Sequence, residues 1–174
     1  MKRLIASILF LPIWVSAQKA DIKIQVTATV SYLDRADEYS SKCLTLLKKG
    51  LLAKDKPEIK RLVDEAMKLA HKAENQSELA EQKADQIEVA AKKIGCFTAA
   101  AEADDAEDYC RQLGYFTFEI GIYTKKAMNE LELVYMQEYM NKAVGYAENA
   151  YESIKNAKAE LENAIKDVDG CDNE

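Results

Sequence analysis

Apolar residues recur every three or four positions along most of this chain, which is the spacing that places them on one face of an α-helix. One series lies close to a heptad repeat and is interrupted only at Gln76; it consists of Ile59, Leu62, Ala66, Leu69, Ala73, Ala80, Ile87, Ala91 and Ile94. Further series run over residues 113–127 and 133–168. Together with a first helix that ends near Lys49, the pattern predicts four long amphipathic helices.

Glycine residues mark three of the expected helix ends. Gly50, Gly95 and Gly170 follow the first, second and fourth apolar series, and glycine is the residue that most often ends a helix. Asn129 is the best available turn between the third and fourth helices, although no glycine or proline supports it. The sequence therefore predicts helix ends near residues 49, 94, 129 and 170.

Capping residues mark two of the expected helix starts. Asp55 and Glu58 can cap the second helix, and Pro57 is tolerated in its first turn because the missing N–H would be unpaired there anyway. Asp104 and Glu107 form a second capping pair, which predicts that the third helix begins between residues 98 and 104.

One segment alternates like a strand. Residues 21–30 place an apolar side chain at every second position, which is the period of a half-buried strand. Because a single strand has no partner in this chain, we expect the segment to extend the first helix or to lie across the bundle.

These elements predict an all-α fold, an up-down-up-down bundle of long amphipathic helices. A short α-solenoid of helical hairpins is the alternative. The sequence also contains a weak internal repeat, in which Gly95-Cys96 and Gly170-Cys171 lie seventy-five residues apart. This repeat leads to the further hypothesis of a duplicated helical hairpin over residues 31–96 and 98–171.

The N-terminus has the pattern of a secretory signal peptide. Lys2 and Arg3 precede an apolar run over residues 4–15, and small residues follow at positions 15–17. We expect residues 1–17 to be removed and residues 18–174 to form a single helical domain. The protein is then exported, periplasmic or secreted, and the apolar run is too short for a membrane span.

The net charge of the chain indicates which classes of partner it can bind. The chain contains 24 basic and 30 acidic residues, a net charge of −6, with the basic residues scattered along the sequence. Such a chain is not expected to bind nucleic acid, or an anionic membrane through its bulk charge.

Four cysteines in an exported chain predict disulfides. Cys96 and Cys110 are the expected pair, because a simple bundle brings both near one end. Cys43 and Cys171 would lie at opposite ends, so the pairing of these two is left open. The spacings match neither a zinc motif nor a Cys-x-x-Cys redox motif.

The histidine, methionine and acidic residues of the chain do not indicate a catalytic, metal or cofactor site. His71 is the single histidine and lies between two positions of the predicted apolar face, so it should point into solvent. Met67 lies one turn from His71, and Met136 one turn from Met140, but methionine pairs at this spacing are usually core residues. The acidic run over residues 102–108 is explained by helix capping. We expect no catalytic residue, no cofactor and no metal site.

We recognise no motif of a known family in the sequence. Long helices rich in alanine and tyrosine, without a catalytic set, predict a non-enzymatic protein that binds another protein through a helix face, as an adaptor, chaperone or inhibitor does. The alternative is a carrier of a small apolar ligand or a metal within the bundle. A homo-oligomer is compatible with both.

Overall fold

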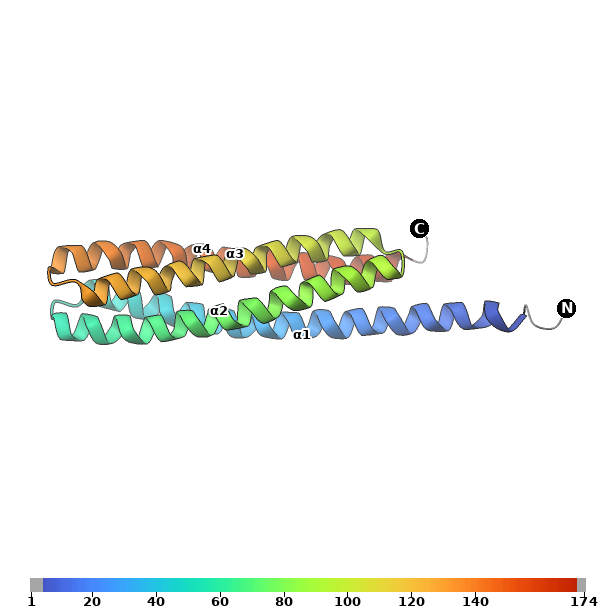
Figure 1. Ribbon diagram of the computed structural model, residues 1–174, viewed down its shortest axis with the longest axis horizontal. Coiled ribbons are helices and arrows are strands. Elements are labelled where there is room, and N and C mark those ends of the chain that lie inside the picture. The colour runs from blue at the N-terminus through green and yellow to red at the C-terminus, as the bar shows by residue number, and fades with distance from the viewer. Residues whose placement is uncertain (1–4, 172–174) are drawn as a thin grey trace.

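The computed structural model describes residues 5–171 and, from residue 15 on, their side chains. Lys2 and Arg3 of the predicted signal peptide lie outside the described residues. Four helices follow one another, α1 (Ile5–Leu52), α2 (Lys56–Lys93), α3 (Phe97–Asn129) and α4 (Leu133–Gly170). They run alternately up and down, which confirms the predicted all-α bundle (Figure 1).

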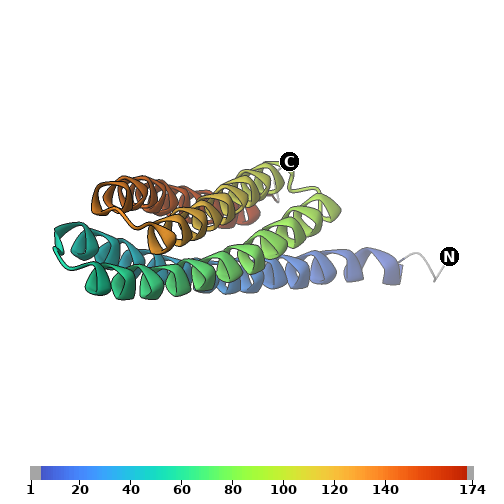
Figure 2. The ribbon, with the colours of Figure 1, turned by 60° about the vertical axis from the view of Figure 1, so that its left-hand side comes forward.

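The helices form two antiparallel pairs, α1 with α2 and α3 with α4, that lie against each other (Figure 2). Each helix packs along the next one in the chain, and α4 returns to pack against α1. The contact between α1 and α4 is the least extensive of the four. Both hairpin turns lie at one end of the bundle, and the α2–α3 turn lies at the other, beside the C-terminus (Figure 1).

The core follows a heptad repeat in all four helices. Buried positions alternate in steps of four and three residues, for example Ile59, Val63, Ala66, Ala70, Ala73, Ser77, Ala80, Ala84, Ile87 and Ala91 in α2. A sustained heptad is the pattern of helices that supercoil around each other. Alanine is the commonest buried residue in α2, α3 and α4, so these helices can approach closely.

The core of α2 differs from the predicted one. Ser77 is buried where the sequence suggested an interruption at Gln76, and Ala70 replaces Leu69. Leu69 lies at the flank of the core, only partly buried. Leu69 lies one residue before the core position Ala70, so the prediction assigned the larger apolar residue to the core in place of the alanine.

Most of the predicted helix ends are confirmed. Asp55 accepts a hydrogen bond from the backbone N–H of Glu58, with Pro57 in the first turn. Gly95 adopts a positive φ of 80°, and the N–H groups of Gly95 and Cys96 donate to the carbonyls of Lys92 and Ala91. This is a Schellman motif, in which glycine ends the helix without strain.

Three expectations on local structure are resolved differently. The first helix continues through Gly50, which is buried, and ends at Leu52. The third helix begins at Phe97, ahead of the expected range, so Asp104 and Glu107 are not its cap. The alternating segment 21–30 is part of α1, and its residues Ile22, Val26 and Thr29 face the core. The helical spacing of these three residues was therefore the relevant pattern.

Candidate functional site

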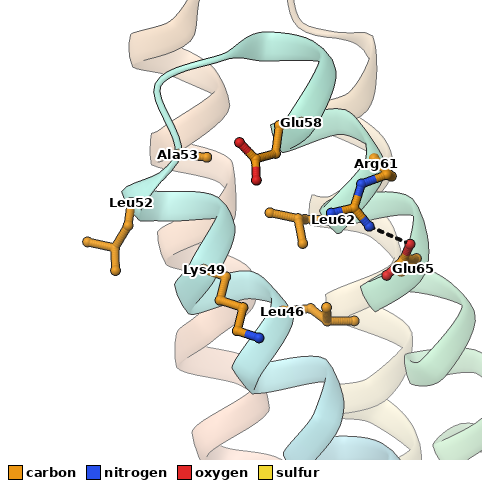
Figure 3. Close-up of a pocket in the computed structure, with 8 residues that line it drawn as sticks. All are labelled: Leu46, Lys49, Leu52, Ala53, Glu58, Arg61, Leu62 and Glu65. Atoms are coloured by element: carbon orange, nitrogen blue, oxygen red, sulfur yellow. Dashed lines mark hydrogen bonds and ion pairs between the residues drawn. The ribbon is translucent and has the colours of Figure 1, made fainter.

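A cavity of about 660 Å³ forms an open groove on the outer side of the α1–α2 hairpin. Figure 3 shows the side chains of Leu46 and Lys49 extending from α1, and that of Leu62 from α2, toward the space between the two helices. The cavity is lined by Leu46, Lys49, Leu52, Ala53, Glu58, Arg61, Leu62 and Glu65. It therefore combines an apolar floor with charged rims.

A second cavity of about 370 Å³ continues this groove along the helices. It shares Leu46 with the first cavity and is also lined by Ser41, Lys42, Thr45 and Leu69. Leu62 and Leu69 are one heptad apart on α2, so they form a row parallel to the core. We call the surface of these two cavities the α1–α2 groove; it has the shape that an additional helix would fill.

The rims of the α1–α2 groove carry charges of both signs. Arg61 forms an ion pair with Glu65 at 2.8 Å. Lys49 and Glu58 line the groove, and neither side chain has a hydrogen-bond or ion-pair partner among the described residues. Two unpaired charges beside leucine side chains are available to a ligand that brings the opposite charges.

A tyrosine cluster fills the seam between α3 and α4. The rings of Tyr123 and Tyr146 stack with centroids 5.6 Å apart, and Phe116 and Tyr139 adjoin them. The ammonium groups of Lys126 and Lys142 lie over the Tyr123 ring, 4.7 and 5.8 Å from its centroid. Because these rings already pack against one another, they stabilise the α3–α4 pair.

The structure does not assemble the histidine and methionine candidates into a ligand site. His71 is exposed, and its Nδ1 lies 3.1 Å from a carboxylate oxygen of Glu74. Met136 and Met140 are fully buried in a separate core cluster that contains Ile59, Val63 and Ala127. These residues are placed as an exposed histidine and two core methionines.

Three carboxylates from α2 and α3 come together on the bundle surface. The oxygens of Asp85, Glu88 and Glu107 lie within 4.8 Å of one another. Glu88 is paired with Lys92, and Glu107 with Arg111. Because lysine and arginine already neutralise two of the three carboxylates, this cluster is a surface charge network.

A carboxyl pair that sequence reasoning missed joins α3 to α4. The pKa of Glu102 is raised to about 7. The causes are a hydrogen bond to Glu160, burial, and the negative charges of Glu160, Asp167 and Asp105. Glu102 belongs to the acidic run that was expected to cap α3, but it lies inside the helix. Glu160 and Asp167 lie on another helix, so spacing along the chain could not reveal the pair.

The disulfide differs from the expected one. Cys96 is bonded to Cys171, with Cα atoms 5.4 Å apart, and the predicted Cys96–Cys110 pair is wrong. Cys43 and Cys110 are free and buried. Burial raises the pKa of each thiol to about 12, with the charges of Glu81 and Glu107 adding to the effect at Cys110. Neither thiol is a nucleophile at neutral pH.

The comparisons with known proteins assign no family. No family model matches the chain, and no curated protein matches it. Among the described residues, no helix is both long enough and apolar enough to cross a membrane.

Proposed function

We propose that this chain is an exported, non-enzymatic protein-binding module, and that the α1–α2 groove binds an amphipathic helix of another protein. The observation that carries the proposal is the row of leucines at the flank of the core. Leu46 on α1 and Leu69 on α2 are only partly buried against the core. Leu62, one heptad before Leu69, is 5% exposed and lines the inner side of the same groove. A fifth helix with an apolar stripe can pack against this row as the neighbouring helices pack against one another.

Unsatisfied polar atoms along the same side support this proposal. The side-chain oxygens of Gln18, Gln25 and Gln76 are buried and have no hydrogen-bond partner. Gln18 and Gln25 line a further cavity between α1 and α2, of about 390 Å³, and Gln76 continues the row of Leu62 and Leu69 by one heptad. Buried polar groups normally have partners, and donors on a docked helix would reach these oxygens once the glutamine side chains turn outward.

The charges of the groove indicate what the bound helix carries. Lys49 has no acidic partner in the groove, so a carboxylate on the bound helix would pair with it. The partner is therefore an amphipathic helix with an apolar stripe and an acidic residue beside that stripe. Electrostatic complementarity of this kind contributes more to orientation and specificity than to affinity.

The alternative, a carrier of a small apolar ligand or a metal, receives less support. The bundle axis is lined by core residues such as Ala73, Ala106 and Ala147 that are about 1% exposed or less. The cavities described above are open grooves on the surface. A ligand bound in the axis would have to displace packed side chains.

Site-specific photo-crosslinking in the native exported fraction tests the proposed function. A photoreactive residue at Leu69, in the groove, is expected to capture one dominant protein. The same residue at Phe118, an exposed position on α3, is the matched control and should not capture that protein. The crosslinked peptide should lie in an amphipathic helix of the partner. Equal capture from both positions, or capture of an unstructured segment, would contradict the proposal.

Two Lys→Glu substitutions test whether the charge at the groove rim contributes to binding. Lys49→Glu reverses the unpaired charge at the groove rim without touching the core, so capture from position 69 should fall severalfold. Lys125→Glu, at an exposed position on α3, makes the same change in net charge and should leave capture unchanged. If both substitutions act equally, the effect belongs to net charge and not to the groove.

A further inference from the structure

Charge is distributed unevenly between the two ends of the bundle. Residues 42–61, which form the end of α1, the first hairpin turn and the start of α2, contain seven basic and two acidic residues. The basic residues are Lys42, Lys48, Lys49, Lys54, Lys56, Lys60 and Arg61. At the opposite end of the bundle, residues 99–111 contain five acidic residues and one arginine. The second hairpin turn, at the same end as residues 42–61, adds Glu130 and Glu132, so residues 48–61 and 130–135 together contain six basic and four acidic residues. This end is therefore weakly positive, and the opposite end is negative.

The basic end also carries exposed apolar side chains. Leu52 is 82% exposed at the end of α1, and Leu131 and Val134 are 76% and 71% exposed in and after the second hairpin turn. The two turns lie at the same end of the bundle (Figure 1), where the Lys56 ammonium donates to the backbone carbonyl of Leu131. We call residues 48–61 together with 130–135 the hairpin tip.

Three lysines of the hairpin tip are not engaged within the protein. Lys49, Lys54 and Lys60 have no ion-pair or hydrogen-bond partner among the described side chains. By contrast, Lys48 pairs with Glu148 at 2.9 Å. The unengaged lysines surround aliphatic side chains that water solvates poorly, and an exposed apolar patch with a charged rim marks an interaction surface.

We propose that the hairpin tip docks the protein onto an anionic lipid surface. In this arrangement Leu52, Leu131 and Val134 enter the headgroup region, and the unengaged lysines contact lipid phosphates. The bundle stands on the membrane with its acidic end away from it. This proposal needs no protein partner. The hairpin tip shares Lys49 and Leu52 with the α1–α2 groove, so a helix bound in the groove and a membrane at the tip would compete for these two side chains.

The shape of the hairpin tip favours a lipid surface over an acidic protein. The three aliphatic side chains project from the end of a bundle, at 71–82% exposure. A protein partner would need a separate preformed pocket for each projecting side chain. A lipid interface is fluid and can accommodate these side chains without preformed pockets. Aliphatic side chains enter such an interface readily, and the lysine ammonium groups remain at the level of the headgroups.

The net charge of −6 predicted that the protein does not bind an anionic membrane. The distance between the two ends of the bundle explains why the hairpin tip can nevertheless bind one. The 33 residues of α3 place the acidic end ~50 Å from the hairpin tip at about 1.5 Å per residue. The Debye length is about 8 Å at physiological ionic strength. The acidic end is therefore screened from a surface that the tip contacts.

Vesicle flotation with the whole exported protein tests the charge requirement. Vesicles of phosphatidylcholine with phosphatidylglycerol are compared with vesicles of phosphatidylcholine alone. The apolar run of residues 4–15, where it is retained, binds both kinds of vesicle, so the measured quantity is the ratio of the two affinities. We expect binding that favours the anionic vesicles and weakens with salt. A ratio of one would overturn the proposal.

Matched triple variants locate the effect. K49Q/K54Q/K60Q should reduce binding to anionic vesicles roughly 100-fold, since each lysine near a membrane contributes about fivefold. K83Q/K93Q/K155Q changes the net charge equally, away from the tip, and should retain binding. Equal losses in both variants would overturn the proposal. Thermal unfolding of each variant verifies that the bundle remains folded.

A fluorescent reporter tests insertion directly. Trp14 is the only tryptophan of the chain and lies in the segment 1–17 that is expected to be removed on export, so the exported protein allows one tryptophan at a chosen site. Leu131→Trp should show a blue-shifted emission on anionic vesicles, and Tyr151→Trp, at a half-exposed position on α4, should not. A shift at position 151 alone, or at neither position, would overturn the proposal.

Discussion

Cys96 and Cys171, 75 residues apart, are joined by a disulfide at the end of the bundle where α3 begins and α4 ends. They are also the two cysteines that follow glycine at the ends of α2 and α4. The bond closes a loop that contains the whole α3–α4 hairpin. It therefore ties the C-terminus to the turn that connects the two halves of the bundle.

Replacing Cys171 by serine should lower the free energy of unfolding by about 4 kcal/mol, the loss of loop-closure entropy expected for a loop of this length. Urea unfolding of the variant and the wild type measures the difference. A reducing agent should destabilise the wild type by a similar amount and leave Cys171→Ser unchanged. An unreduced digest should contain the Cys96–Cys171 peptide pair, and a Cys96–Cys110 pair would contradict the structure.

Cys43 and Cys110 should be unreactive in the folded protein. Burial raises the pKa of both thiols to about 12, so the thiolate that reacts with disulfide reagents is scarce at pH 8. We expect no labelled thiol in the native protein and two in denaturant. Because their pKa is raised above the unfolded value of 9.0, the thiols also make stability fall as the pH rises above about 9. Rapid labelling of the native protein would show that these cysteines are accessible.

The number and ends of the helices could be predicted because local chemistry determines them. Asp55, Pro57 and Gly95 act through their own backbone and nearest neighbours, and the structure places helix boundaries at all three. Asn129, the least supported turn, is also the last residue of α3. In each case the information lies within a few residues.

The disulfide and the carboxyl pair could not be predicted in the same way, because they depend on how the helices meet. Since α3 begins at Phe97, Cys110 lies roughly 20 Å along the axis from the helix start, too far from Cys96 for a disulfide. Cys171 ends the neighbouring helix and reaches Cys96 directly. The weak internal repeat, which places Cys96 after the second helix and Cys171 after the fourth, was the sequence signal for this pair.

Overpacking the core should destabilise the bundle strongly. Ala103 is fully buried in α3, and a leucine there has no space between closely packed helices, so we expect Ala103→Leu to cost about 1–3 kcal/mol. Ala101→Leu, on the exposed face of the same helix, is the matched control and should change stability by less than about 0.5 kcal/mol. Chemical unfolding measures both. Equal stability of the two variants would contradict the close packing of the alanine core.

The Glu102–Glu160 pair should make the stability of the protein depend on pH near neutrality. Hydrogen bonding to Glu160, burial and neighbouring carboxylates raise the pKa of Glu102 to about 7, above its usual value of 4.5. A raised pKa means that the folded state holds a proton that the unfolded state releases. The stabilisation is therefore complete below about pH 4.5 and is lost as the pH rises through 7.

Glu102→Gln retains a hydrogen-bond donor and removes the charge. At pH 8 the variant should be more stable than the wild type by about 1 kcal/mol, since solvent screens part of the repulsion, and the difference should vanish near pH 5. Unfolding at several pH values measures it, with Glu162→Gln, an exposed position on α4, as the control. Parallel pH profiles for the wild type and Glu102→Gln would show that the two carboxyl groups do not share a proton between α3 and α4. A loss of the slope in Glu102→Gln alone would locate the pH response at this contact.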